Sequence, residues 1–199
     1  PTAFGAYSLV ENHVYTREAL RDFYSLLKPG GFLVITRWLQ IPPSESLRVG
    51  ATIISVLNAL GAPGPEEAIA ALRTWMTVTY IVKRGSLTQK ELEAVRRFCR
   101  SNRFDLVYLP GMSQEEANVY NILEKPYDYE AFRELLRSPL DRFYRSYIYD
   151  IRPVTDDRPF FSHYFKWSQV TVILQNLGKS WQPYGGAGFL VLFVLLGVA

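Results

Sequence analysis

The stretch 15–38 constrains the fold of this chain more than any other part of its sequence. Thr16 predicts the start of a helix, since its hydroxyl can accept a hydrogen bond from a free backbone N–H of the first turn. Apolar residues at helical spacing would form the buried face of this helix: Leu20, Phe23, Tyr24 and Leu27. The segment 28–31 (Lys-Pro-Gly-Gly) ends the helix, and 32–36 (Phe-Leu-Val-Ile-Thr) is an uninterrupted apolar strand. We therefore predict a helix that leads directly into a central strand covered on both faces.

Further along the chain, segments with helical and with strand character alternate. Helices are predicted at 44–60, 66–73 and 88–101. Strands are predicted at 76–82 and 104–109, where β-branched and aromatic residues are frequent. Strands that alternate with helices are typical of an α/β domain, in which helices are layered on a sheet.

The pattern changes after Pro110-Gly111. Helices are predicted at 114–123 and 129–137. The aromatic stretch 144–151 would either pair as a strand or pack as a cover over the core, and a dense motif follows at 155–167.

The composition limits the chemistry that the chain can carry. Its 199 residues suffice for one domain, its hydrophobic content of 48% excludes a disordered chain, and its net charge of +3 permits an anionic partner without requiring one. The only cysteine, Cys99, can form no internal disulfide, and its charged helical surroundings indicate a structural thiol rather than a nucleophile. His13 and His163 are far apart in the sequence, which excludes a Cys/His zinc site of ordinary spacing. We expect no metal cofactor.

The end of the sequence predicts contact with a membrane. Residues 188–199 are apolar or glycine, and as a helix they would cross about 18 Å of a roughly 30 Å hydrocarbon core. A buried core helix or strand is the alternative. A truncated transmembrane helix is favoured because aromatic residues precede it like an interfacial belt: Trp167, Trp181 and Tyr184. Lys166 and Lys179 lie on the same side and would place the preceding domain in the cytoplasm. The chain then divides into an α/β domain (1–166), a juxtamembrane linker (167–187) and the truncated helix (188–199).

Three segments together resemble the spermidine synthase-like branch of the S-adenosylmethionine (SAM)-dependent transferases, and most closely its bacterial members with membrane helices. They are Gly5-Ala6-Tyr7 with Tyr15–Leu20, then Leu27–Val34, then Thr155-Asp156-Asp157-Arg158-Pro159-Phe160-Phe161. The resemblance implies the C-terminal half of a Rossmann-like class I transferase domain, with strands five to seven. It also implies that SAM or decarboxylated SAM is a substrate, and that the glycine-rich cofactor turn and the catalytic acid precede Pro1.

The activity implied by the resemblance is transfer of an aminopropyl group from decarboxylated SAM to a small amine, as in polyamine biosynthesis. By the same resemblance, this chain alone would be inactive. Two alternatives stay open. One is a SAM-dependent methyltransferase on the same fold, and the other is a non-catalytic cytoplasmic binding module of a membrane protein.

The resemblance also points to the candidate substrate-binding residues Tyr7, Glu11, Tyr15, Asp156 and Asp157, and the end of the predicted strand adds Arg37 and Trp38. In the loop before the first helix, a carboxylate could attract an amine cation and tyrosines could enclose it, with a solvated surface loop as the alternative. Arg37 and Trp38 follow a strand whose carboxyl end would face the ligand, where Arg37 could bind an anion or stack on Trp38. Asp156 or Asp157 would either point into an amine pocket or cap a turn and pair with Arg158, anchoring the C-terminal segment.

A group of arginines lies before the dense motif at 155–167: Arg133, Arg137, Arg142, Arg145 and Arg152. Interleaved acidic residues offset much of their charge, so a solvated helix face is the first interpretation and contact with anionic lipid the second. No RNA-binding motif accompanies them, and we expect no nucleic-acid partner.

Overall fold

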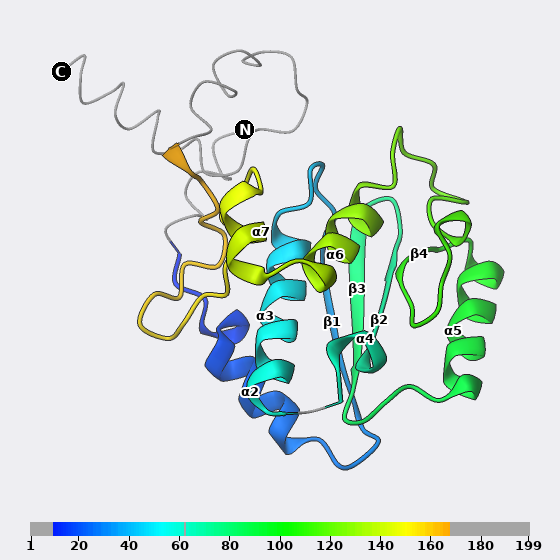
Figure 1. Ribbon diagram of the computed structural model, residues 1–199, viewed down its shortest axis with the longest axis horizontal. Coiled ribbons are helices and arrows are strands. Elements are labelled where there is room, and N and C mark those ends of the chain that lie inside the picture. Colours follow the sequence, from blue (N-terminus) through cyan, green and yellow to red (C-terminus); the bar gives the residue numbers. More distant parts are fainter. Residues whose placement is uncertain (1–9, 62, 168–199) are drawn as a thin grey trace.

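The computed structural model describes residues 10–61 and 63–167 (Figure 1). Its α-helices are α2 (Arg17–Leu26), α3 (Glu45–Ala59), α4 (Pro65–Ala68), α5 (Gln89–Asn102), α6 (Tyr127–Arg137) and α7 (Leu140–Ser146). Short 3-10 helices are η1 (His13–Tyr15) and η2 (Gln114–Glu116). The strands are β1 (Phe32–Trp38), β2 (Ile69–Arg73), β3 (Thr77–Lys83) and β4 (Asp105–Tyr108). The mixed α/β character predicted from the sequence is confirmed.

The strands form one four-stranded sheet in the order β1-β3-β2-β4, with every neighbouring pair antiparallel. On β3, Tyr80 lies opposite Ile35 of β1 on one side and opposite Ala71 of β2 on the other. Because β1 and β2 are both antiparallel to β3, they are parallel to each other. The segment that contains α3 connects these two strands, as expected, since parallel strands need a long crossover connection.

Helices lie on both faces of this sheet. On one face, α2, α3 and α6 share a buried apolar cluster with Val78 and Tyr80 of β3 (Figure 1). On the other face, α5 packs with Ala70 and Leu72 of β2 and Leu106 of β4. Residues along a strand alternate between the two clusters because successive side chains point to opposite faces.

Two helix starts follow their capping residues, as predicted. Thr16 Oγ1 accepts a hydrogen bond from the backbone N–H of Ala19 (3.2 Å) at the start of α2. Thr88 and Glu91 form a reciprocal capping box at the start of α5. Glu91 also accepts a hydrogen bond from Lys83 Nζ (2.7 Å), which is the main reason that the pKa of Glu91 falls to about 2.

The helix predicted at 66–73 is wrong. Helix α4 ends at Ala68, and all of β2 (Ile69–Arg73) is a buried strand. Alanine and leucine favour helices, but β2 pairs with a strand on each edge and is covered on both faces. Tertiary pairing outweighs the local preference here.

The helix predicted at 114–123 is also wrong, because within it only η2 (Gln114–Glu116) is helical. Asn118 takes a left-handed backbone conformation with φ 57°. The following N–H groups, which a helix would have directed along its axis, turn to the carboxylate of Asp105. The stretch 144–151 packs as a cover, with Tyr149 buried after the end of α7.

Within the part of the chain that the structure describes, the stretch 32–36 differs from the predicted central strand covered on both faces. Strand β1 is at the edge of the sheet. On one of its faces the side chains remain exposed: Phe32 (43%), Val34 (58%) and Trp38 (56%). Helix α5 packs over β2 and β4, so no described helix covers this face of β1.

A buried arginine holds the irregular C-terminal segment against the domain. Arg48 of α3 is 2% exposed and donates hydrogen bonds to the backbone carbonyls of Phe160 (3.3 Å), His163 (2.7 Å), Phe161 and Asp150. Buried carbonyls outside regular structure need such partners. One side chain therefore replaces the backbone pairing that a strand would provide.

Among residues 10–61 and 63–167, no helix is both long enough and apolar enough to cross a membrane. The transmembrane helix predicted at 188–199 lies outside the described residues, as do Trp181, Tyr184 and Lys179 and all but the first residue of the linker predicted at 167–187. Membrane association stays a prediction.

Candidate functional site

Five side chains meet at the carboxyl end of β1 and form what we call the Arg37 cluster: Tyr15, Arg37, Glu45, Phe161 and Ser162. The guanidinium carbon of Arg37 lies 4.7 Å from the centroid of the Tyr15 ring and 5.2 Å from that of Phe161. Arg37 donates from Nη2 to Glu45 Oε2 and from Nη1 to the Tyr15 hydroxyl (3.3 Å). Ser162 Oγ donates to the other oxygen of Glu45 (3.0 Å). The cluster therefore holds a cation between two aromatic rings and a carboxylate.

The charges of Arg37 and Glu45 compensate each other in a sheltered position. The exposed side-chain fraction is 18% for Arg37 and 11% for Glu45. Burial works against the charged guanidinium, but the charge of Glu45 and its hydrogen bond outweigh burial and raise the pKa of Arg37 above its ordinary value. Among the described residues, the buried Arg37 Nε has no hydrogen-bond acceptor. While the pair is intact, Glu45 neutralises the charge that Arg37 would offer to an anionic substrate.

The members of the cluster come from four parts of the fold. Arg37 is near the end of β1, and Tyr15 is the last residue of η1. Glu45 is the first residue of α3, where the partial positive charge of a helix N-terminus favours a carboxylate. Phe161 belongs to the C-terminal segment, and its backbone carbonyl accepts a hydrogen bond from Arg48. The cluster therefore depends on long-range packing.

Gln40 supports the position of Glu45. Its Oε1 accepts hydrogen bonds from Ser44 Oγ and from the backbone N–H of Glu45 (3.3 Å), and its Nε2 donates to the Tyr164 hydroxyl (3.1 Å). The amide thus links the start of α3 to the C-terminal segment.

Of the predicted site residues, the structure brings Tyr15 and Arg37 together. Trp38 is adjacent in sequence, but strand alternation points it to the opposite face. Arg37 stacks on Tyr15 and Phe161 rather than on Trp38. Tyr7 lies outside the described residues.

Glu11 and Asp156 meet at His13 instead of at the Arg37 cluster. His13 Nε2 is 3.7 Å from Glu11 Oε2, and His13 Nδ1 is 3.8 Å from Asp156 Oδ1. The backbone N–H of Asp156 donates to Glu18 Oε2 (3.2 Å) in the first turn of α2. Asp156 and Asp157 lie in an exposed turn that these contacts connect to the start of the domain.

Sequence reasoning missed Glu45, Ser162 and Arg48. Glu45 is the first acidic residue after the break at Pro42-Pro43, and Ser162 directly follows the segment Thr155–Phe161 within the dense motif 155–167, so the sequence offered a signal for both. The signal for Arg48 was a charged residue inside an otherwise apolar helical stretch, where a buried arginine needs acceptors from elsewhere.

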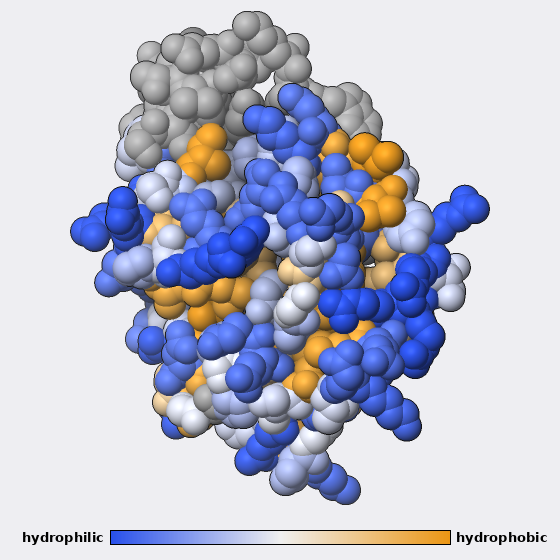
Figure 2. Space-filling model, turned by 45° about the vertical axis from the view of Figure 1, so that its right-hand side comes forward, coloured by the Kyte–Doolittle hydropathy of each residue, from blue (hydrophilic) through white to orange (hydrophobic). Residues whose placement is uncertain are grey.

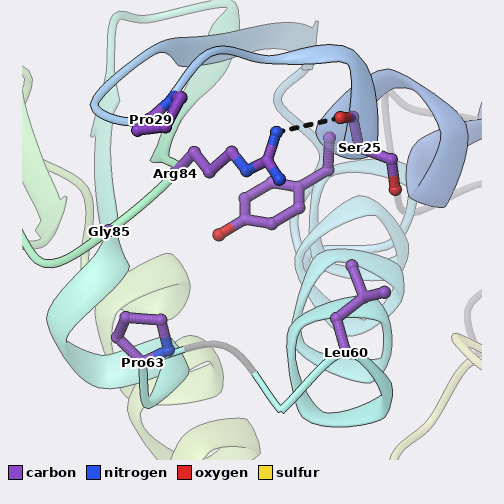
Figure 3. Close-up of a pocket in the computed structure, with 7 residues that line it drawn as sticks. Ser25, Pro29, Leu60, Pro63, Arg84 and Gly85 are labelled. Atoms are coloured by element: carbon purple, nitrogen blue, oxygen red, sulfur yellow. Dashed lines mark hydrogen bonds between the residues drawn. The ribbon is translucent and has the colours of Figure 1, made fainter.

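A cavity of about 380 Å³ lies at the other end of β1 and α3 (Figure 3). Tyr24, Leu60 and Arg84 are among its lining residues. Arg84 donates from Nη1 to the backbone carbonyls of Ser25 (3.0 Å) and Leu27, where α2 ends. Its charge therefore stabilises a helix C-terminus, and none of the predicted site residues lines this cavity.

Neither metal ligands nor known relatives assign a chemistry to the Arg37 cluster. Within the described part of the chain, no group of three or more His, Cys, Asp and Glu side chains is placed to hold a metal ion. Comparison with protein-family models, with curated proteins and with solved structures finds no match to this chain. A function therefore has to come from the residues and the fold of the chain itself.

Removing one charge of the Arg37–Glu45 pair is expected to destabilise the protein, and removing the second charge as well should cost less than the first removal did. Arg37→Met leaves a sheltered carboxylate without its cation, and Glu45→Gln leaves the guanidinium without its anion. We expect each to lower the free energy of unfolding by about 2–3 kcal/mol. The double variant should be more stable, by about 1–2 kcal/mol, than the sum of the two single-variant losses predicts. Urea denaturation of the four proteins measures this coupling, and strict additivity would mean that the pair contributes nothing.

Proposed function

We propose that this chain is the C-terminal part of a SAM-dependent transferase domain of the spermidine synthase-like kind. The observation that carries the proposal is the strand arrangement: β1 and β2 are parallel, α3 lies in their connection, and β3 runs antiparallel between them. The class I transferase fold ends in the same way, with its seventh strand antiparallel between the fifth and the sixth. In this assignment β1, β2 and β3 are the fifth, sixth and seventh strands.

The exposed edge of β1 supports the same assignment. Its second edge has no partner strand among the described residues, and its uncovered face carries Phe32, Val34 and Trp38. Edge strands of soluble proteins normally avoid such a long apolar surface, because it invites pairing with other strands. A strand of this composition suits an internal position in a larger sheet, as the fifth strand of a transferase domain requires.

The Arg37 cluster lies where the proposal needs a substrate site, since ligands of open α/β sheets bind at the carboxyl ends of strands. The rings of Tyr15 and Phe161 and the carboxylate of Glu45 are surroundings suited to an alkylammonium group. The guanidinium of Arg37 occupies these surroundings in the structure. An acceptor amine would bind beside Arg37 or compete with it for Glu45.

In the proposed reaction, the acceptor amine attacks the aminopropyl carbon that is bonded to the sulfonium sulfur of decarboxylated SAM. A C–N bond forms, the C–S bond breaks with its electron pair passing to sulfur, and methylthioadenosine leaves. The proton lost by the amine passes to a base that the resemblance places before Pro1. The described residues would hold and orient the amine, and we assign none of them to SAM itself.

Mass spectrometry of products tests this proposal on the full-length polypeptide from which the chain comes. The protein, in detergent or nanodiscs, is incubated with SAM or decarboxylated SAM and a panel of polyamines. We expect methylthioadenosine and an aminopropylated amine, and a loss of at least tenfold in rate for Glu45→Gln. S-adenosylhomocysteine in place of methylthioadenosine would mean a methyltransferase, and no product from folded protein would overturn catalysis.

A non-catalytic binding module is the second candidate, and one observation favours it. The carboxylate and the cation of the Arg37 cluster already neutralise each other, so the cluster is complete without a ligand. In either case we propose that the domain is on the cytoplasmic side of a membrane, which rests on the sequence pattern at 166–199 alone.

A further inference from the structure

The loop 118–123, which we call the inverted loop, turns its asparagine side chains into the fold and exposes three of its large apolar ones. Asn121 is 8% exposed, whereas Val119, Tyr120 and Ile122 are 45%, 39% and 67% exposed. Surface loops ordinarily show the opposite pattern, because buried polar groups need partners and exposed apolar side chains gain nothing from water.

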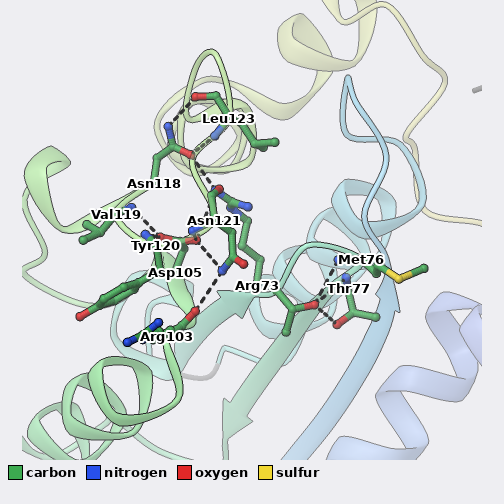
Figure 4. A network of polar contacts seen from close by, with 11 residues as sticks. Arg73, Met76, Thr77, Arg103, Asp105, Asn118, Val119, Tyr120, Asn121 and Leu123 are labelled. Atoms are coloured by element: carbon green, nitrogen blue, oxygen red, sulfur yellow. Dashed lines mark hydrogen bonds and ion pairs between the residues drawn. The ribbon is translucent and has the colours of Figure 1, made fainter. Parts of the chain in front are cut away.

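Buried hydrogen bonds hold this inverted arrangement in place. The carboxylate of Asp105 accepts from the backbone N–H groups of Val119 (2.5 Å), Tyr120 (2.8 Å) and Asn121 (2.8 Å). Asn121 Nδ2 donates to Asp105 Oδ2 (2.9 Å). Figure 4 shows Asn118 and Asn121 turned toward this network and the side chains of Val119 and Tyr120 pointing away from it. The loop therefore presents its apolar side chains from a fixed backbone.

Arg73 completes the network from the neighbouring strand. Its Nη2 donates to Asn118 Oδ1 (2.7 Å) and to the backbone carbonyl of Asn121 (2.6 Å), and lies 3.4 Å from Asp105 Oδ2. Asn118 in turn bonds both backbone groups of Leu123 (2.8 Å each). The buried charge of Asp105 is thus neutralised within the fold, and the loop adds no negative charge at the surface.

The surface beside the inverted loop combines an apolar side chain with arginines of α5. Arg96 pairs there with Glu116 (2.7 Å), and the exposed Glu124 follows the loop. Phe98 on α5 is 50% exposed. Arg100 lines a cavity of about 180 Å³ together with Val119 and Tyr120, and Arg103, at the end of α5, accepts a hydrogen bond from Asn121 through its carbonyl. In the described residues no ion pair involves Arg100 or Arg103. Figure 2, which brings this side of the molecule forward, shows apolar side chains exposed among charged ones.

We propose that the inverted loop and the end of α5 dock on the surface of an anionic lipid bilayer. Val119, Tyr120 and Ile122 would enter the interface between headgroups and acyl chains, where tyrosine and aliphatic side chains are favoured. Arg100 and Arg103 would contact lipid phosphates. A bilayer is the occupant we choose because the same sequence carries the apolar run 188–199, which predicts entry into a membrane. This proposal does not depend on the transferase assignment.

A polarity-sensitive fluorophore at position 122 tests the contact in the full chain. Ile122→Cys is the labelling site, and Leu26→Cys, at a residue that is 84% exposed on α2, is the matched control. Cys99 is 3% exposed, and burial raises its pKa to about 11, so it should not compete for the label. Because the run 188–199 is present in both proteins, the comparison isolates the loop.

With vesicles of phosphatidylcholine and phosphatidylglycerol, we expect a blue shift at position 122 and none at position 26. In the protein labelled at position 122, Val119→Ser should reduce this blue shift, and Arg100→Gln with Arg103→Gln should remove its dependence on salt. Circular dichroism checks that the variants fold. An equal shift at both positions, or an equal response to phosphatidylcholine alone, would overturn the proposal. A shift that grows with protein concentration without vesicles would identify a second copy of the chain as the occupant and also overturn it.

Discussion

Replacing Arg48 with leucine is expected to lower the free energy of unfolding by about 4 kcal/mol. The guanidinium is buried and satisfies backbone carbonyls of Asp150, Phe161 and His163 in a segment with little regular structure of its own. Leucine removes those donors, and a buried carbonyl left without a partner costs about 1–3 kcal/mol. Urea denaturation measures the loss, and hydrogen exchange should show it concentrated in residues 150–164.

Arg152→Leu is the matched control for Arg48→Leu. Arg152 also bonds Asp150, but through the carboxylate and from a side chain that is 67% exposed. An exposed ion pair contributes at most about 1 kcal/mol, so this variant should remain near the wild type. If Arg48→Leu were as stable as Arg152→Leu, the segment would have to be held by its apolar contacts alone.

Arg48 also matters for the candidate site. The segment that it holds carries Phe161 and Ser162 into the Arg37 cluster. Arg48→Leu should therefore disturb the Arg37 cluster, although it changes neither Arg37 nor Glu45. Arg48→Lys keeps a charge but cannot span the same four carbonyls, and we expect it to fall between the wild type and Arg48→Leu.

The second large effect that we expect is a loss of folding stability as the pH rises from about 4 to about 7, and Asp128 is its source. Its side chain is 4% exposed, and its Oδ2 has no hydrogen-bond partner within the described residues. Burial raises the pKa of this carboxyl from 3.8 to about 7, although the charge of Arg73 and a backbone hydrogen bond act in the opposite direction. In the folded protein the acid therefore prefers to be neutral.

Stability falls with rising pH because the pKa of Asp128 is raised in the folded state. The contribution of neutral Asp128 to stability is fully present below the unfolded pKa of 3.8 and is lost as the pH rises through about 7. The interval between these values corresponds to a free energy on the order of 4 kcal/mol. Asp128→Asn imitates the neutral acid, so it should match the wild type near pH 4 and exceed it by roughly that amount at pH 8.

The measurement is the difference in unfolding free energy between wild type and Asp128→Asn, taken by urea denaturation from pH 4 to pH 8.5. The difference is needed because other groups titrate in the same range. Burial and the charge of Arg48 lower the pKa of His163, so its contribution to stability rises with pH. If the unfolding free energies of the two proteins changed with pH in parallel, Asp128 would be ionised at little cost in the folded state.

The predicted elements that the structure confirms rest on local signals. Thr16 and Thr88 cap their helices because a cap involves only the first turn. Strand β3 and helices α3, α5 and α6 lie close to their predicted limits, since their apolar periodicity is strong over many residues. The candidate site was predicted in part, because Tyr15 belongs to a motif that can be recognised along the chain and Arg37 follows a strand that can be predicted from its apolar run.

Contacts between distant parts of the chain account for the rest. Residues 69–73 have helix-forming composition and become a strand because β3 and β4 pair with both of their edges. Residues 118–123 cannot form a helix once Asp105 binds their N–H groups. No local signal could place Glu45 against Arg37 or Phe161 over it, since hydrogen bonds and ring contacts between separate elements exist only after the chain has folded.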